Sequence, residues 1–171
     1  MSKSMMGRRA FLATTSAAGA IVIIAGGNLV IGGNGAWAMS TKALTGDEAA
    51  MLVRMARATY PHAMLDDAIY GKVIHGLDEK AATDPALLQS LQEGAATLKA
   101  KKFDTLDEAG QVGVLKEIES SKPFQTVRGE CITGIYNNPD VWKVLGYEGS
   151  SAELGGYINR GFSDIDWLQD A

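Results

Sequence analysis

The sequence predicts an all-α fold: a bundle of about five helices followed by an irregular C-terminal arm rich in glycine and aromatic residues. Two observations carry this prediction. Apolar residues recur at helical spacing in five segments between residues 45 and 135, and recognisable helix-start signals punctuate those segments. No stretch alternates convincingly between apolar and polar residues, as a half-buried strand would, so the helices are expected to pack on one another.

The first helix is expected to begin at the capping box Thr45–Glu48 and to end before Pro61. In a capping box the Thr45 hydroxyl accepts a hydrogen bond from the Glu48 amide, and the Glu48 carboxylate accepts one from the Thr45 amide. The apolar residues at helical spacing in this segment are Ala49, Leu52, Val53, Ala56 and Tyr60.

Two more helices are expected next. The second runs from about Asp66 to Ala82, with one apolar stripe along it. Asp84 is the expected N-cap of the third helix, and Pro85 follows at its first position, where the missing N–H costs nothing. The basic run Lys99–Lys102 closes this helix, because positive charge suits the carbonyl end; a contact with an anionic partner is the alternative.

The fourth helix is expected to open at a second capping box, Thr105–Glu108, and the fifth at Pro123. The only cysteine, Cys131, lies within the fifth helix, so no intrachain disulfide is possible. We expect Cys131 to be a small buried apolar side chain, the alternatives being a nucleophile or a link to another chain.

The arm begins at about residue 137. Asn138 precedes Pro139 and therefore resists the helical region, while residues 140–145 have room for one or two turns before Gly146. Beyond Gly146 the chain is too apolar to be disordered and too irregular for a bundle helix. It is expected either to fold back over the bundle or to lie on another protein.

Residues 1–38 resemble a twin-arginine export signal, with Arg8 and Arg9 followed by Phe11 and Leu12. Residues 10–41 carry no charge, and Ala36 and Ala38 form the small-residue site that a signal peptidase needs. We expect cleavage after Ala38 and a single periplasmic domain over residues 39–171. A general secretory signal and an uncleaved membrane anchor are the alternatives, although glycine and asparagine dilute the apolar run.

The domain after the signal is acidic. All 20 acidic residues follow Ala38, whereas Lys3, Arg8 and Arg9 of the 16 basic residues precede it, which leaves a net charge of −7. Nucleic acid is not expected as a partner, because binding phosphates needs a basic face.

No group of residues passes a test for catalysis. The mature chain has no phosphate-binding glycine loop after a strand and no C-x-x-C-H haem motif. His62 with Asp66 and Asp67 is the best metal candidate, although a solvated loop is favoured. His75 and Glu79 offer only two ligands. We expect no catalytic, cofactor-binding or metal site; the alternatives are a free-standing periplasmic metal enzyme and a helical protein that binds a small molecule.

The segments Gly134–Pro139 and Trp142–Gly149 resemble the C-terminal signature of the gluconate 2-dehydrogenase subunit 3 family. The resemblance implies a non-catalytic small subunit of a periplasmic sugar or sugar-acid dehydrogenase. It implies that FAD is held by a large catalytic partner of the glucose–methanol–choline type, with a cytochrome c as one candidate electron acceptor of the complex. The membrane would be reached only through the signal or the complex. Such a subunit lends its export signal to the catalytic chain and stabilises it by binding.

The arm is the expected contact with that partner, because aromatic residues and arginine dominate interface energies. The candidates are Trp142, Tyr147, Tyr157, Arg160, Phe162 and Trp167. Asp164 and Asp166 lie between apolar residues and are expected to pair with a basic groove of the partner. The alternative is that Asp164 caps a short turn and Asp166 is solvated.

Overall fold

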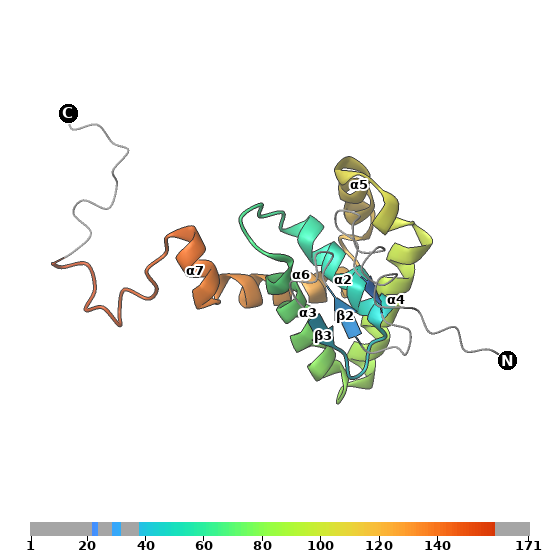
Figure 1. Ribbon diagram of the computed structural model, residues 1–171, viewed down its shortest axis with the longest axis horizontal. Helices are drawn as coiled ribbons and strands as arrows, with labels where there is room; N and C mark the ends of the chain where they lie inside the picture. The colour runs from blue at the N-terminus through green and yellow to red at the C-terminus, as the bar shows by residue number, and fades with distance from the viewer. Residues whose placement is uncertain (1–21, 24–28, 32–37, 160–171) are drawn as a thin grey trace, which may run out of the picture.

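The computed structural model describes residues 22–23, 29–31 and 38–159, which form a helical bundle with a small sheet beside it and an extended C-terminal arm (Figure 1). The all-α prediction is confirmed. The elements in chain order are β1 (Val22–Ile23), β2 (Leu29–Ile31), β3 (Ala38–Ser40), α2 (Gly46–Thr59), α3 (Asp67–Ala81), α4 (Pro85–Ala100), the 3₁₀ turn η1 (Phe103–Thr105), α5 (Glu108–Ile118), α6 (Lys122–Tyr136) and α7 (Pro139–Leu145).

Helix α2 is the centre of the bundle and contacts α3, α4, α5 and α6. It starts where the sequence predicts: the Glu48 amide donates to the Thr45 hydroxyl at 3.3 Å, and the Thr45 amide donates to the Glu48 carboxylate at 2.8 Å. Its core face is fully buried because neighbouring helices cover it on several sides. The side chains that are at most 1% exposed on this face are Ala49, Leu52, Met55 and Ala56.

The predicted starts of α3 and α4 are also confirmed, with Asp66 and Asp84 as their N-caps. Helix α6 packs against both helices, and glycines allow the close approach. A Cβ atom added at Gly134 would lie 2.8 Å from Val73 of α3, and one added at Gly94 of α4 would lie 2.6 Å from Pro123. These two positions therefore set how near α6 comes to its neighbours.

The prediction of a second capping box at Thr105–Glu108 is wrong. Asp107, not Thr105, is the N-cap of α5, and its carboxylate accepts from the Gly110 amide at 2.9 Å. Thr105 ends the 3₁₀ turn η1, where its hydroxyl donates to the Lys102 carbonyl. The physical reason is Phe103, which is fully buried and draws residues 103–105 into that turn, so that the next good capping side chain begins the helix.

The sequence does not predict the three short strands. Strand β2 is central and pairs antiparallel with β1 on one side and β3 on the other. β2 lies against α2 and β3 against α3. The strands have only two or three residues, which is too short for an alternating pattern to be recognised. Ala38, the expected last residue of the signal, is the first residue of β3.

Within the described part of the chain, no helix has the length and apolar character needed to cross a membrane.

Candidate partner interface

Helix α7 is a short helix with strong local stop and start signals. The Asn138 side chain accepts from the Asp140 amide at 3.0 Å, and Pro139 occupies the first position. Gly146 ends the helix at φ +72°, a left-handed conformation that favours glycine. The end of α7 is thus the one expected from the sequence.

Helix α7 touches the bundle through α6, and its one fully buried side chain is Val141. A helix of seven residues has room for only one inward-facing stripe. Figure 1 shows α7 at one end of the molecule, with the chain after it leading away from the bundle. In the described residues the arm therefore does not fold back over the bundle.

Trp142 shapes the first turn of the arm. Its indole N–H donates to the Tyr136 carbonyl, and its ring meets the Tyr147 ring edge-on with centroids 5.3 Å apart. Gly149 has φ +101°, and a Cβ atom there would lie 3.4 Å from the Trp142 ring. The tryptophan is half-buried by these contacts, so it acts within the chain and orders the turn between α7 and residue 149.

Tyr136 joins three parts of the molecule at the end of α6. The His62 Nε2 atom and the Tyr136 hydroxyl are 2.7 Å apart, and the Tyr60 ring meets the Tyr136 ring edge-on at 6.0 Å. The Tyr136 carbonyl accepts the bond from Trp142. The loop after α2, the end of α6 and the start of the arm are therefore linked through one residue.

The arm exposes a run of large apolar side chains, which we name the arm surface. Its members are 43–82% exposed, and Ile158 is the most exposed of them. The arm surface consists of Val144, Leu145, Tyr147, Leu154, Tyr157 and Ile158. Several large apolar side chains exposed on a projecting segment suit a surface that binds another protein.

The expected interface residues are placed only in part. Tyr147 and Tyr157 belong to the arm surface, whereas Trp142 is half-buried. The other expected contacts lie outside the described residues, as do most residues of the expected export signal and its cleavage site. These are Arg160, Phe162, Asp164, Asp166 and Trp167, and Arg8, Arg9, Phe11, Leu12 and Ala36.

Sequence reasoning missed the aliphatic members of the arm surface, such as Leu145 and Ile158. The sequence prediction favours aromatic residues, because they dominate interface energies. Val144 and Leu145 lie three and four residues after the buried Val141, on the same helical face, and are nevertheless exposed, so no local pattern distinguishes them from core residues.

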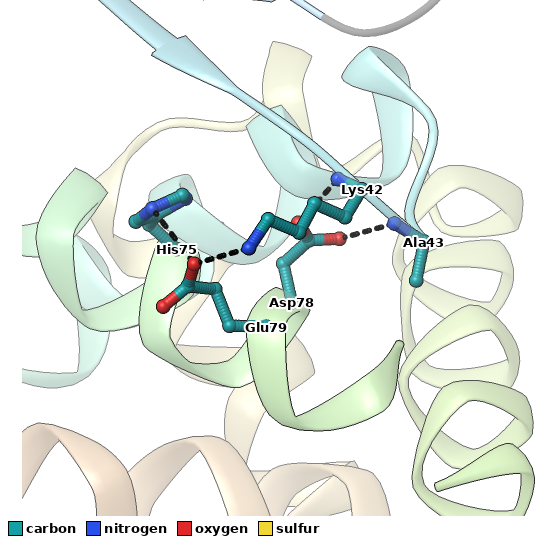
Figure 2. Close-up of polar contacts among 5 residues, drawn as sticks. All are labelled: Lys42, Ala43, His75, Asp78 and Glu79. Atoms are coloured by element: carbon teal, nitrogen blue, oxygen red, sulfur yellow. Dashed lines mark hydrogen bonds and ion pairs between the residues drawn. The ribbon is translucent and has the colours of Figure 1, made fainter. Parts of the chain in front are cut away.

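A polar cluster holds the chain just before α2 (Figure 2). Asp78 of α3 is fully buried, and its carboxylate accepts from the amides of Lys42, Ala43 and Leu44 at 2.6, 3.0 and 2.7 Å. Buried charge is tolerated when it is fully hydrogen-bonded in this way. Asp78 is thus a structural anchor, which the sequence did not mark because its three partners come from a distant segment.

Beside the anchor, the Lys42 ammonium bonds the Glu79 carboxylate at 2.6 Å, and His75 Nε2 lies 3.8 Å from the same oxygen (Figure 2). The hydrogen bond and charge of Lys42 hold the pKa of Glu79 below its usual value, and Glu79 raises the pKa of Lys42. Both groups are solvent-exposed, so the pair contributes little to stability.

The three residues of the metal site suggested by the sequence each interact with a different partner. His62 bonds Tyr136, Asp66 caps α3 through the Ala68 amide, and Asp67 pairs with Arg57 at 3.6 Å. Among the described residues, no three His, Cys, Asp or Glu side chains gather closely enough to hold a metal ion.

Cys131 is fully buried in α6, as expected, and burial raises the pKa of its thiol to about 12. A thiol with so high a pKa is a poor nucleophile at neutral pH, because the reactive species is the thiolate.

Arg54 lines two clefts beside α2. One, of about 330 Å³, is bordered by α2 and α4, and the other, of about 420 Å³, by α2 and α5. Asp104 lines both and lies 3.7 Å from Arg54. The walls combine both charge signs with apolar side chains, without a cluster of reactive groups.

Comparison with protein-family models, with curated proteins and with solved structures finds no match to this chain.

Proposed function

We propose that this chain is the non-catalytic small subunit of a heteromeric, FAD-dependent sugar or sugar-acid dehydrogenase, exported to the periplasm by the twin-arginine route. FAD belongs to a large catalytic partner of the glucose–methanol–choline type. The subunit carries the export signal for the pair and stabilises the partner by binding it. The observation that carries the proposal is the arm, which projects from a folded bundle and exposes the arm surface.

Three further features support a binding role. The resemblance of Gly134–Gly149 to the subunit 3 family falls on the end of α6, on α7 and on the turn that Trp142 orders. The bundle buries a hydrophobic core that, among the described residues, includes none after Val141, which supports a binding role for the arm. The acidic charge after Ala38 suits a protein partner better than a nucleic acid.

The interface test is affinity purification of the tagged subunit from cells that produce it naturally. We expect a large chain with a flavin absorption spectrum to co-purify. The double substitution Leu145→Asp with Ile158→Asp should lower its recovery by about tenfold or more, because desolvating an introduced charge penalises the contact. Lys101→Ala, at the end of α4, is the matched control and should leave recovery unchanged. A subunit that always purifies alone, without a flavoprotein, would reject the proposal.

The export test replaces Arg8 and Arg9 together by lysine, which keeps the charge and removes the pair. We expect the chain and its partner to remain in the cytoplasmic fraction. Unchanged periplasmic levels of this chain would exclude the twin-arginine route. A gene for a large FAD-binding chain without a signal of its own, next to the gene for this chain, is a simpler observation in favour.

The clefts at Arg54 favour a second candidate function, the binding of a small molecule between helices. Thermal melts of the purified chain with sugars and sugar acids distinguish it. A shift in the melting temperature with ligand concentration supports small-molecule binding by this chain alone.

A further inference from the structure

The bond between Ala38 and Met39, at which the expected signal would be removed, lies inside folded structure. In the antiparallel ladder Ala38 is opposite Ile31, and Met39 is opposite Val30. Met39 is only 6% exposed. Because β2 also lies against α2 and β3 against α3, the ladder is held to the bundle rather than standing in solvent.

A peptidase needs the backbone around this bond as a single extended strand that is not part of a sheet. Proteases bind the substrate backbone as a single extended strand, whose N–H and C=O groups pair with the enzyme. In this chain β3 is an edge strand, and one edge of its backbone is already paired with β2. The cleft of a peptidase encloses the strand on both sides, which leaves no room for β2, so the ladder must open before the bond is cut.

The chain after the bond is anchored as well. Asp78 accepts from the amides of residues 42–44 at 2.6–3.0 Å, and Lys42 is bonded to Glu79. Thr41 is only 4% exposed. These contacts prevent β3 from detaching easily at the end that leads to α2. Exposure of the Ala38–Met39 bond therefore depends on the separation of β2 from β3.

We propose that β2 guards the processing site: the folded precursor keeps the Ala38–Met39 bond in the β2–β3 ladder, and cleavage proceeds only from an opened form. The inference rests on the export signal in the proposed function. Cleavage is hydrolysis, in which water adds across the peptide bond to give an Ala38 carboxylate and a Met39 ammonium. When opening is fast, the cleavage rate follows the population of the open form. Such a guard suits a chain that folds before export, since cytoplasmic proteases meet it before the signal peptidase does.

The test compares cleavage of the purified full-length chain with that of a synthetic peptide of residues 30–45. Two enzymes are used: thermolysin, which cuts before bulky apolar residues such as Met39, and a bacterial signal peptidase in detergent. Mass spectrometry follows the Ala38–Met39 bond alone. We expect the folded chain to be cut at least about tenfold more slowly than the peptide by both enzymes.

Val30→Pro opens the ladder, because β2 is the central strand and proline can neither donate to a neighbour nor adopt strand geometry freely. We expect its cleavage rate to approach that of the peptide to within about threefold. Val30→Ala is the matched control, since it shortens the side chain and keeps the N–H, and it should remain slow. Far-UV circular dichroism checks that both variants keep their helices.

Equal rates for the folded wild-type chain and the peptide would overturn the guard, and this comparison needs no variant to fold. A Val30→Pro chain that is folded and still slow would overturn the role of β2. If the signal peptidase cuts neither the peptide nor any variant while thermolysin does, the processing site is wrong. That result would reject the proposal together with the cleavable signal, without bearing on partner binding through the arm.

Discussion

The carboxylate of Asp78 fixes the chain where it approaches α2. Removing it in Asp78→Ala leaves three backbone amides without their acceptor. We expect the free energy of unfolding to fall by about 3 kcal/mol, because hydrogen bonds to a charged group are strong and orphaned buried donors are costly. Chemical denaturation measures the loss. Glu79→Gln, one residue along and solvent-exposed, is the control and should change stability little; equal effects of the two changes would contradict the anchor.

Cys131 gives a second prediction at the scale of one residue. Its thiol is fully buried with a pKa of about 12. A disulfide reagent such as DTNB at pH 8 should label the native chain at least about 100-fold more slowly than the chain in denaturant, because only an opened form presents a thiolate. The absorbance of the released thiolate reports the rate. Rapid labelling of the native chain would mean that α6 is accessible there.

The raised pKa of Cys131 also sets a pH dependence. The folded pKa, about 12, lies above the usual value of 9.0, so the contribution of this residue to stability is complete below pH 9. It is lost progressively as the pH rises from 9 toward 12, since the unfolded chain releases the proton first. Cys131→Ala should flatten that part of the stability profile, measured by denaturation between pH 8 and 11.

Two glycines in helices give opposite expectations at the scale of elements. In Gly94→Ala the new Cβ would lie 2.6 Å from the Cβ of Pro123, so α4 and α6 must separate. We expect a loss of about 1–3 kcal/mol, typical of overpacking. At Gly113 in α5 nothing lies within 4 Å of a new Cβ, so Gly113→Ala should gain up to about 1 kcal/mol from helix propensity. Thermal melts of both variants check the signs, and a stabilised Gly94→Ala chain would contradict the close packing.

Elements with local start signals could be predicted from the sequence, and elements fixed by distant contacts could not. Thr45, Asp66 and Asp84 cap helices because the bonds they make are within three residues. The predicted start of α5 is wrong because the burial of Phe103, a tertiary effect, places Thr105 in a 3₁₀ turn. The Asp78 anchor joins residues that are 34 to 36 positions apart, and no local pattern reveals such contacts. The β2–β3 ladder joins residues that are closer in the chain, but its strands of three residues are too short to show alternation.

The sequence predicts where the arm begins and only some of the side chains that it exposes; binding of a partner there stays a prediction. The change in composition after Asn138 marked the arm, and Tyr147 and Tyr157 are on its surface. The residue type of Trp142 predicts an interface anchor. Its half-buried position depends on the Tyr136 carbonyl and on a left-handed Gly149, and no local sequence pattern indicates either contact.

At the scale of the whole molecule, a truncation that ends after Gly146 is expected to leave the stability of the bundle nearly unchanged and to abolish binding of the partner. The bundle core of α2–α6 does not include the arm beyond Val141, so the melting temperature should fall by no more than about 5 °C. Recovery of the flavoprotein partner should be lost, because four of the six members of the arm surface are removed. Thermal melts and affinity purification are made on the same preparation. The full-length chain with Lys101→Ala is the control, and it should keep both its melting temperature and its recovery of the partner. If the truncated chain melts far earlier yet recovers the partner undiminished, the arm stabilises the bundle and the interface lies elsewhere; the clefts at Arg54 would then be the next surface to substitute.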